Sequence, residues 1–88
     1  MTDQEIELKV KEVLSKKFAA PLDRISPTTR LAEDLGVDSF GAIELMFELE
    51  ESFDLQIPDS EIEQIRTVQD VVGYISGWMA KTAGASPT

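Results

Sequence analysis

The stretch DLGVDSFGAIELMFELEESFDLQIPD, residues 34–59, decides the fold, because it reads as a turn, one amphipathic helix and a closing Ile-Pro-Asp. A helix is predicted from Ser39 to Ser52. At about 100° per residue, its large apolar side chains, together with that of the next residue, lie on one side. That side consists of Leu45, Leu49 and Phe53. A helix with one apolar face must bury it against other elements, so a small helical bundle is predicted.

Ser39 stands at the start of this predicted helix, where two interpretations of a serine compete. Its hydroxyl can cap the helix by accepting a hydrogen bond from an unpaired backbone N–H of the first turn. The same position also suits an attached phosphate, because the free N–H groups and the positive end of the helix dipole favour an anion. Local features alone favour the cap, since serine is a preferred residue where helices begin.

A second face of the same helix is acidic. This acidic stripe consists of Glu44, Glu48 and Glu51, and it is joined by Asp38 near the helix start and by Glu50 on its flank. Like charges four residues apart cost roughly 0.2–0.5 kcal/mol in an isolated helix. Lysines could have offset that cost, yet no Lys or Arg occurs between Arg30 and Arg66. We therefore interpret the acidic stripe as a docking surface for a protein partner in preference to a merely solvated face.

Phe40 and Phe47 lie two helical turns apart and share a face that borders the acidic stripe. Aromatic residues at helical spacing most often belong to a core. Here the buried face is already supplied by the apolar side described above, so the alternatives of burial and partner contact stay open for both phenylalanines.

The composition excludes several classes of function. The 88 residues make one small domain with a modest core, and they contain no Cys and no His. This excludes a disulfide framework, a thiolate zinc site, a cysteine nucleophile and the usual base that activates a serine. The sequence also lacks the ligand pattern of an EF-hand loop, so no dedicated metal site is predicted and only weak, diffuse divalent binding stays as a hypothesis. We expect no enzymatic activity of the chain itself.

The charge indicates the kind of partner. Seventeen acidic against eight basic residues give a net charge of −9, which repels nucleic acid and steers basic protein surfaces toward the chain. No apolar run approaches the roughly 20 residues of a membrane span, and the acidic N-terminus is unlike a secretory signal. We expect a cytoplasmic protein without membrane insertion, and a monomer.

Helices are also predicted on both sides of the central stretch. The first runs from about Asp3 to Phe18 and begins with a capping box of Thr2 and Glu5. A long first loop from Ala19 to Asp38 follows, and a structureless loop of this length is expected to pack against the core. Its apolar residues, spaced to reach that core, are Leu22, Ile25, Leu31 and Leu35.

A short helix is predicted after the central stretch, with Asp59 as its cap. The last helix opens at Thr67, and Asp70 three residues later approximates a capping box. The fold class is therefore all-α, a small bundle of three main helices plus one short helix, with a long first loop. Residues 1–81 are predicted to form the helical domain, and the small, polar residues 82–88 a flexible C-terminal tail.

Residues 34–59 resemble the central signature of acyl carrier proteins: an acidic D-L-G-x-D-S entry, a helix containing E-L and L-E-E, an aromatic, and I-P-D. The flanking segments fit the helical plan of that family more loosely. The resemblance implies that Ser39 carries a 4'-phosphopantetheine arm through a phosphodiester, with acyl groups held as thioesters on the thiol of the arm. It further implies a carrier of fatty-acid or related polyketide or specialised lipid biosynthesis.

The resemblance also implies roles for the neighbours of Ser39. Gly36 would help the backbone turn into the site, and Asp38 would give the phosphopantetheinyl transferase a charge to recognise. Acyl-transfer and chain-elongation enzymes with basic docking patches would contact Phe40, Phe47 and the acidic stripe. The family more commonly has Leu where Phe40 stands and an acid where Gly41 stands, so these two residues leave the partners and the cargo open.

An acyl cargo needs shelter, because each exposed CH₂ costs about 0.8 kcal/mol relative to full burial. A small helical bundle could part its helices to shelter a medium chain, and the candidate pocket residues are then Leu49, Phe53, Ile65 and Ile75. Two alternative functions stay open. One is a peptidyl or aminoacyl carrier protein, which shares the serine and the helical plan but is less favoured by the LGVDS sequence and the acidic helix. The other is an unmodified acidic helical interaction module in which Ser39 is only a cap.

Overall fold

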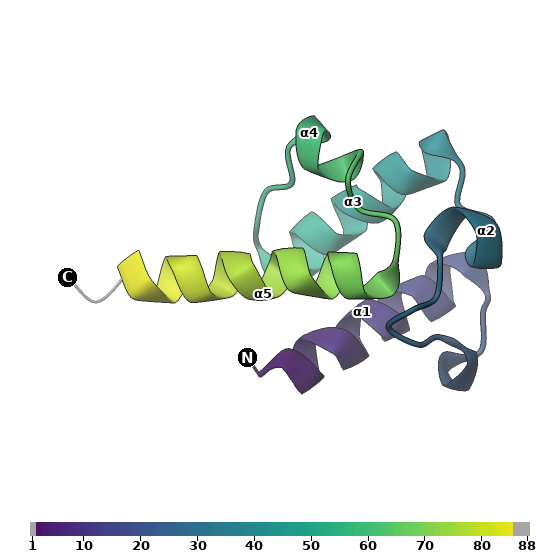
Figure 1. The fold of residues 1–88 in the computed structure, drawn as a ribbon, viewed down its shortest axis with the longest axis horizontal. Coiled ribbons are helices and arrows are strands. Elements are labelled where there is room, and N and C mark those ends of the chain that lie inside the picture. The colour runs from purple at the N-terminus through teal and green to yellow at the C-terminus, as the bar shows by residue number, and fades with distance from the viewer. Residues whose placement is uncertain (1, 86–88) are drawn as a thin grey trace.

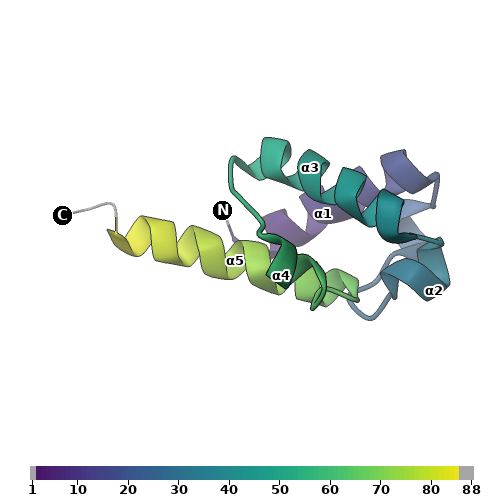
Figure 2. The ribbon, with the colours of Figure 1, turned by 90° about the horizontal axis from the view of Figure 1, so that it is seen from above.

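The computed structural model describes the backbone of residues 2–85 and the side chains of residues 2–80. Its elements in chain order are α1 (Asp3–Phe18), the 3₁₀ helix η1 (Leu22–Arg24), α2 (Leu31–Leu35), α3 (Ser39–Phe53), α4 (Asp59–Ile62) and α5 (Val68–Ala85). The long helices α1, α3 and α5 form the bundle, and α2 and α4 lie at its edge (Figures 1 and 2). No strand occurs in this described part of the chain. The all-α prediction is confirmed.

The first helix has the predicted bounds and the predicted N-terminal capping box. The Glu5 backbone N–H donates to the Thr2 hydroxyl oxygen at 3.2 Å, and the Thr2 N–H donates to the Glu5 carboxylate at 2.8 Å. Lys16 and Lys17 lie in the last turn, where the negative end of the helix dipole favours cations. Local sequence signals therefore suffice to place α1.

The core is built from the inward faces of the three long helices and is completed by residues of the connections. The helices contribute Ile6, Val10, Leu14, Leu45, Met46, Leu49, Phe53, Val68, Val71 and Ile75. The connections contribute Ile25, Val37, Leu55 and Ile57, and the short helix α2 contributes Leu31. The predicted apolar side of α3 is confirmed, and Met46 broadens it. Burial of each such side chain contributes roughly 1.5–3 kcal/mol before conformational entropy is subtracted.

The long first loop is packed against the core, as predicted, but it contains the short helices η1 and α2, which the sequence pattern did not reveal. Ile25 and Leu31 are buried as expected, and Leu35 is half-buried against the core. Leu22 is 43% exposed, so its predicted place in the core is wrong. The chain turns inward only at Ile25, where the backbone becomes extended (φ −94°, ψ 116°).

The second half of the chain departs from prediction at one cap and at one boundary. Pro58, and not Asp59, is the N-cap of α4, and it provides no side-chain cap. α5 continues past the predicted boundary at residue 81 to Ala85, and its C-terminal end projects beyond the bundle in both views (Figures 1 and 2). The rest of the predicted tail, residues 86–88, lies outside the described residues. The division into a domain and a flexible tail stays a prediction.

The start of α5 has the predicted reciprocal cap. The Asp70 N–H donates to the Thr67 hydroxyl oxygen at 3.3 Å, and Asp70 Oδ2 accepts the N–H groups of Arg66 and Thr67, each at 3.1 Å. These hydrogen bonds, first the one from the Arg66 backbone, hold the pKa of the Asp70 carboxyl below its ordinary value. The carboxylate therefore stabilises the folded state in its charged form.

This cap makes the stability of the chain depend on pH. A lowered folded-state pKa contributes stability that is present above the ordinary aspartate pKa and is lost as the pH falls through the folded-state value. We expect Asp70→Asn to lower the free energy of unfolding by about 1 kcal/mol at about pH 7 and by clearly less at about pH 3, measured by urea denaturation. Asp23→Asn, at an exposed carboxylate in η1, is the control. An equal loss for Asp70→Asn at both pH values would contradict the charged cap.

Candidate functional site

The N-terminus of α3 is capped by Asp38 and not by Ser39. The Gly41 N–H donates to Asp38 Oδ1 at 2.6 Å, and the Ala42 N–H donates to the Asp38 backbone oxygen at 2.8 Å. Ser39 is the first residue of the helix and is exposed. Among the described residues, its hydroxyl has no hydrogen-bond partner within the distances of a normal bond. The interpretation of Ser39 as the cap is therefore wrong, because the preceding aspartate fills that role.

The turn that leads to Ser39 is fixed by Gly36 and Val37. Gly36 closes α2 in the left-handed conformation (φ 72°, ψ 25°), and its N–H donates to the Ala32 backbone oxygen at 3.1 Å. Val37 is buried, and its N–H donates to the Leu31 backbone oxygen at 2.9 Å. The chain is thus anchored two residues before Ser39, so the hydroxyl is presented from a fixed backbone.

Two Gly→Ala variants test this turn, because their effects on the free energy of unfolding should have opposite signs. A Cβ at Gly36 would meet no atom within 4 Å, but its φ of 72° disfavours every residue with a side chain. We expect Gly36→Ala to lower the free energy of unfolding by about 1 kcal/mol. Gly73→Ala, inside α5 and equally uncrowded, should raise it by about 0.5–1 kcal/mol. Urea denaturation measures both, and a shift of the same sign in the two variants would contradict the strained turn.

The exposed surface of α3 carries two adjoining stripes. The acidic stripe is exposed at all three glutamates, as predicted. The second, which we call the apolar stripe, consists of Phe40, Ile43 and Phe47, exposed by 69%, 49% and 62%. Burial in the core is thereby excluded for both phenylalanines, and their contact with a partner stays a prediction. Ile43 was missed by the sequence analysis, although its helical spacing between the two phenylalanines is a usable signal.

Glu50, predicted on the flank of the acidic stripe, is engaged in contacts within the chain. Its carboxylate Oε2 accepts the Ile57 N–H at 2.7 Å, and its backbone oxygen accepts the Leu55 N–H at 3.1 Å. Glu50 is half-buried and holds the connection between α3 and α4 against the bundle. Its role is structural, whereas the three glutamates of the acidic stripe are exposed.

A pocket of about 480 Å³ opens beside Ser39, between α2, α3, α4 and the connection to α5. Its apolar lining includes Val37, Ala42, Met46, Ile62 and Ile65, and its polar lining includes Asp38, Ser39, Arg30 and Arg66. Ile65 is the one predicted acyl-pocket residue in this lining. Leu49, Phe53 and Ile75 lie in the core, at most 5% exposed. The structure therefore brings Ser39 and Ile65 together and keeps the other three candidates apart from them.

In the part of the chain that the structure describes, no group of three or more carboxylate, thiol or imidazole side chains could hold a metal ion. None of the described helices combines the length and the apolar character that crossing a membrane requires. Diffuse divalent binding stays a hypothesis.

Comparison with known proteins defines the class first. Residues 8–75 match the family model described as a phosphopantetheine attachment site. The acyl carrier protein of Chlorobium phaeovibrioides is 44% identical over 75 residues, covering 85% of this chain and 96% of the relative. That of Cyanidioschyzon merolae is 45% identical over 75 residues, covering 85% of this chain and 82% of the relative. The solved acyl carrier protein of Enterococcus faecalis superposes with a TM-score of 0.75 at 34% identity, covering 88% and 98%.

These findings place the chain within carrier domains that hold their cargo on a phosphopantetheine arm, and the chain belongs to the acyl carrier protein family. The predicted family, the function as an acyl carrier protein and the covalent 4'-phosphopantetheine cofactor are thereby confirmed. The family assignment also brings interactions with transferases and biosynthetic enzymes as a class.

Proposed function

We propose that Ser39 is the attachment residue for 4'-phosphopantetheine and that the chain carries acyl intermediates of fatty-acid or related polyketide or specialised lipid biosynthesis. The observation that carries this proposal is the cap made by Asp38, which leaves the Ser39 hydroxyl exposed and without a partner among the described residues. The backbone N–H groups of Ser39 and Phe40 also have no partner there. These donors lie at the positive end of the α3 dipole and suit a phosphodiester.

The chain contributes position to the loading reaction, and the transferase contributes the base. A base of the phosphopantetheinyl transferase takes the proton of the Ser39 hydroxyl. The serine oxygen then bonds to the phosphorus that bears the pantetheine part of coenzyme A, and the bond from that phosphorus to the nucleotide part breaks. When bound, the arm supplies a thiol that holds acyl groups as thioesters. With no His or Cys in its sequence, the chain lacks the usual activators of a serine, and we assign it no catalytic residue.

The two stripes of α3 are the proposed docking surface for these enzymes. The acidic stripe offers charge to basic patches, and the apolar stripe beside Ser39 offers Phe40 and Phe47 for burial against a partner. Exposed aromatic side chains next to charged residues are typical of interaction surfaces. Partners would thus contact the chain on the side where the loaded arm begins. We also propose that the chain acts in the cytoplasm and as a monomer.

The pocket beside Ser39 is the proposed first shelter for the acyl chain. Met46, Ile62 and Ile65 can contact the methylenes nearest the arm. Leu49, Phe53 and Ile75 would be reached only if the helices part, because all three are buried in the core.

Intact mass tests the proposal. Incubation with coenzyme A and a promiscuous phosphopantetheinyl transferase should add the mass of one arm, and fragmentation should place it on the peptide that contains Ser39. An unchanged mass would contradict the proposal and favour the alternative of an unmodified interaction module. The mass of the thioester on protein isolated from its source would separate an acyl from a peptidyl or aminoacyl cargo.

A further inference from the structure

The pocket beside Ser39 has an edge made by two arginines from distant parts of the sequence. Arg30 precedes α2, and Arg66 lies in the connection between α4 and α5. The two segments are joined by an isolated antiparallel bridge between Arg30 and Thr67, and the Leu31 N–H donates to the Arg66 backbone oxygen at 2.9 Å. These backbone contacts fix the position of the edge relative to Ser39.

The two guanidinium groups differ in their ion pairing. Arg30 Nη1 lies 2.6 Å from Glu33 Oε2, and Arg30 Nη2 lies 3.3 Å from Asp34 Oδ1, so Arg30 is already neutralised. Arg66 makes no salt bridge to any described acidic residue within 4 Å, although the chain has 17 acidic residues. The neighbouring Asp70 instead uses Oδ2 to accept backbone N–H groups. Arg66 is therefore a cation of this pocket without an ion-pair partner among the described residues.

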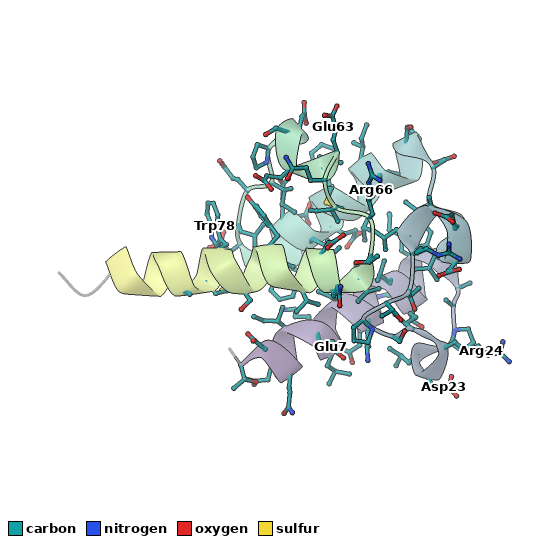
Figure 3. The ribbon with its side chains drawn as sticks, in the orientation of Figure 1. Glu7, Asp23, Arg24, Glu63, Arg66 and Trp78 are labelled. Atoms are coloured by element: carbon teal, nitrogen blue, oxygen red, sulfur yellow. The ribbon has the colours of Figure 1, made fainter. Side chains whose placement is uncertain are left out.

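The acidic residues of the pocket lining are also occupied. Glu33 is paired with Arg30, and Asp38 caps α3 through the Gly41 N–H. Figure 3 shows the Arg66 side chain leaving the α4–α5 connection on the side of the molecule where α2 and α3 lie. A group tethered at Ser39 and entering the pocket would thus meet apolar side chains and one unpaired guanidinium.

We propose that Arg66 binds an anionic group tethered through Ser39, an inference that deepens the proposed function and rests on it. The chemistry is a singly charged oxyanion, for which a guanidinium offers two parallel N–H donors. Two sources can supply it: the phosphodiester of the arm, or the carboxylate at the free end of a dicarboxylic acyl cargo. In the second case the apolar lining, including Met46 and Ile65, holds the methylenes between the thioester and the acid.

The test compares three loaded states of the full chain. The chain is prepared with the arm alone, with a butyryl thioester and with a succinyl thioester that carries ¹³C at its free carboxyl. The ³¹P resonance reports on the phosphodiester, and the ¹³C titration reports the acid dissociation constant of the carboxyl. The variant is Arg66→Gln, and the matched control is Arg24→Gln, an exposed arginine in η1 that lies at a far corner of the molecule (Figure 3).

The outcomes separate the two sources. Binding of the phosphodiester predicts a ³¹P shift with Arg66→Gln and none with Arg24→Gln, in all three states. Binding of the cargo carboxylate predicts that Arg66→Gln lowers the acid dissociation constant of the succinyl carboxyl by up to about fivefold, the range of an exposed ion pair. The butyryl form has no carboxyl, and its ³¹P resonance should then be the same in Arg66→Gln as in Arg24→Gln. The other charged residues of the pocket lining are the same in every variant, so their electrostatic effects cancel between Arg66→Gln and Arg24→Gln. They are Glu33, Asp38 and Arg30.

The proposal is overturned if neither signal distinguishes Arg66→Gln from Arg24→Gln. A third variant, Arg66→Lys, keeps the charge and should retain part of the effect. Failure of the proposed function appears separately and earlier, as a chain that never gains the mass of the arm at Ser39. A chain that is loaded at Ser39 yet indifferent to Arg66 refutes this inference alone.

Discussion

A Ser39→Ala variant will not gain the phosphopantetheine arm under conditions that fully load the unaltered chain, and it will remain folded. The loss is complete because no other hydroxyl stands at the start of α3 beside the pocket. The fold survives because Asp38, and not Ser39, caps the helix. Alanine is also a better helix former than serine, so the free energy of unfolding should change by no more than about 0.5 kcal/mol.

Intact mass and a thermal melt, taken on the same sample, measure the two halves of this prediction. Ser60→Ala is the matched control, since Ser60 is also exposed and also lies in the first turn of a helix, α4. The control should load fully. Transfer of the arm to another residue of the Ser39→Ala variant would refute the site, and a collapsed melt would show that Ser39 has a structural role which the Asp38 cap does not explain.

The choice between Ser39 and Asp38 as the cap illustrates where sequence reasoning ends. Both residue types are good caps and they are adjacent, so the pattern predicts the start of α3 correctly without deciding which oxygen is used. Only the geometry of the first turn places Asp38 Oδ1 on the Gly41 N–H. The same helix was predicted to within one residue of its end at Phe53, because a long apolar period leaves little freedom.

The short helices were missed for a physical reason. η1 and α2 contain too few residues to carry an apolar period, and helices of that length are not stable without tertiary contacts. Their positions depend on where Ile25 and Leu31 enter the core, which is decided by residues far away in the sequence. The exposed Leu22 shows that an apolar residue in such a connection does not by itself predict burial.

The lining of the pocket was only partly predictable. Periodicity identifies an apolar face of a helix, but it does not say whether the core or a cavity meets that face. Leu49, Phe53 and Ile75 lie in the core, so their place in an acyl pocket stays a prediction, whereas Ile65 lines the pocket beside Ser39. The closeness of Arg30 and Arg66 is a non-local contact made by the bridge at Thr67, and no local signal in the sequence reveals it.

The acidic stripe leads to the second large effect. We expect the double change Glu44→Lys and Glu51→Lys to slow loading by the transferase roughly ten- to hundredfold at low ionic strength, the scale on which complementary charge speeds association. Glu48 is left unchanged because it lines a groove with Lys9 and Lys16 of α1, and a lysine there would disturb the bundle itself. The value of kcat/KM for arm transfer measures the effect.

Two control measurements separate the effect of the acidic stripe from the effect of net charge alone. The double change Asp23→Lys and Glu63→Lys alters the charge equally at exposed residues outside α3, and its smaller loss would mark the stripe as the docking surface. Raising the ionic strength to about 1 M shortens the screening length to about 3 Å, so the gap between the two variants should close while Ser39 remains fully loadable. Equal losses in both variants at low salt would mean that overall charge, and not the acidic face of α3, brings the partner to this chain.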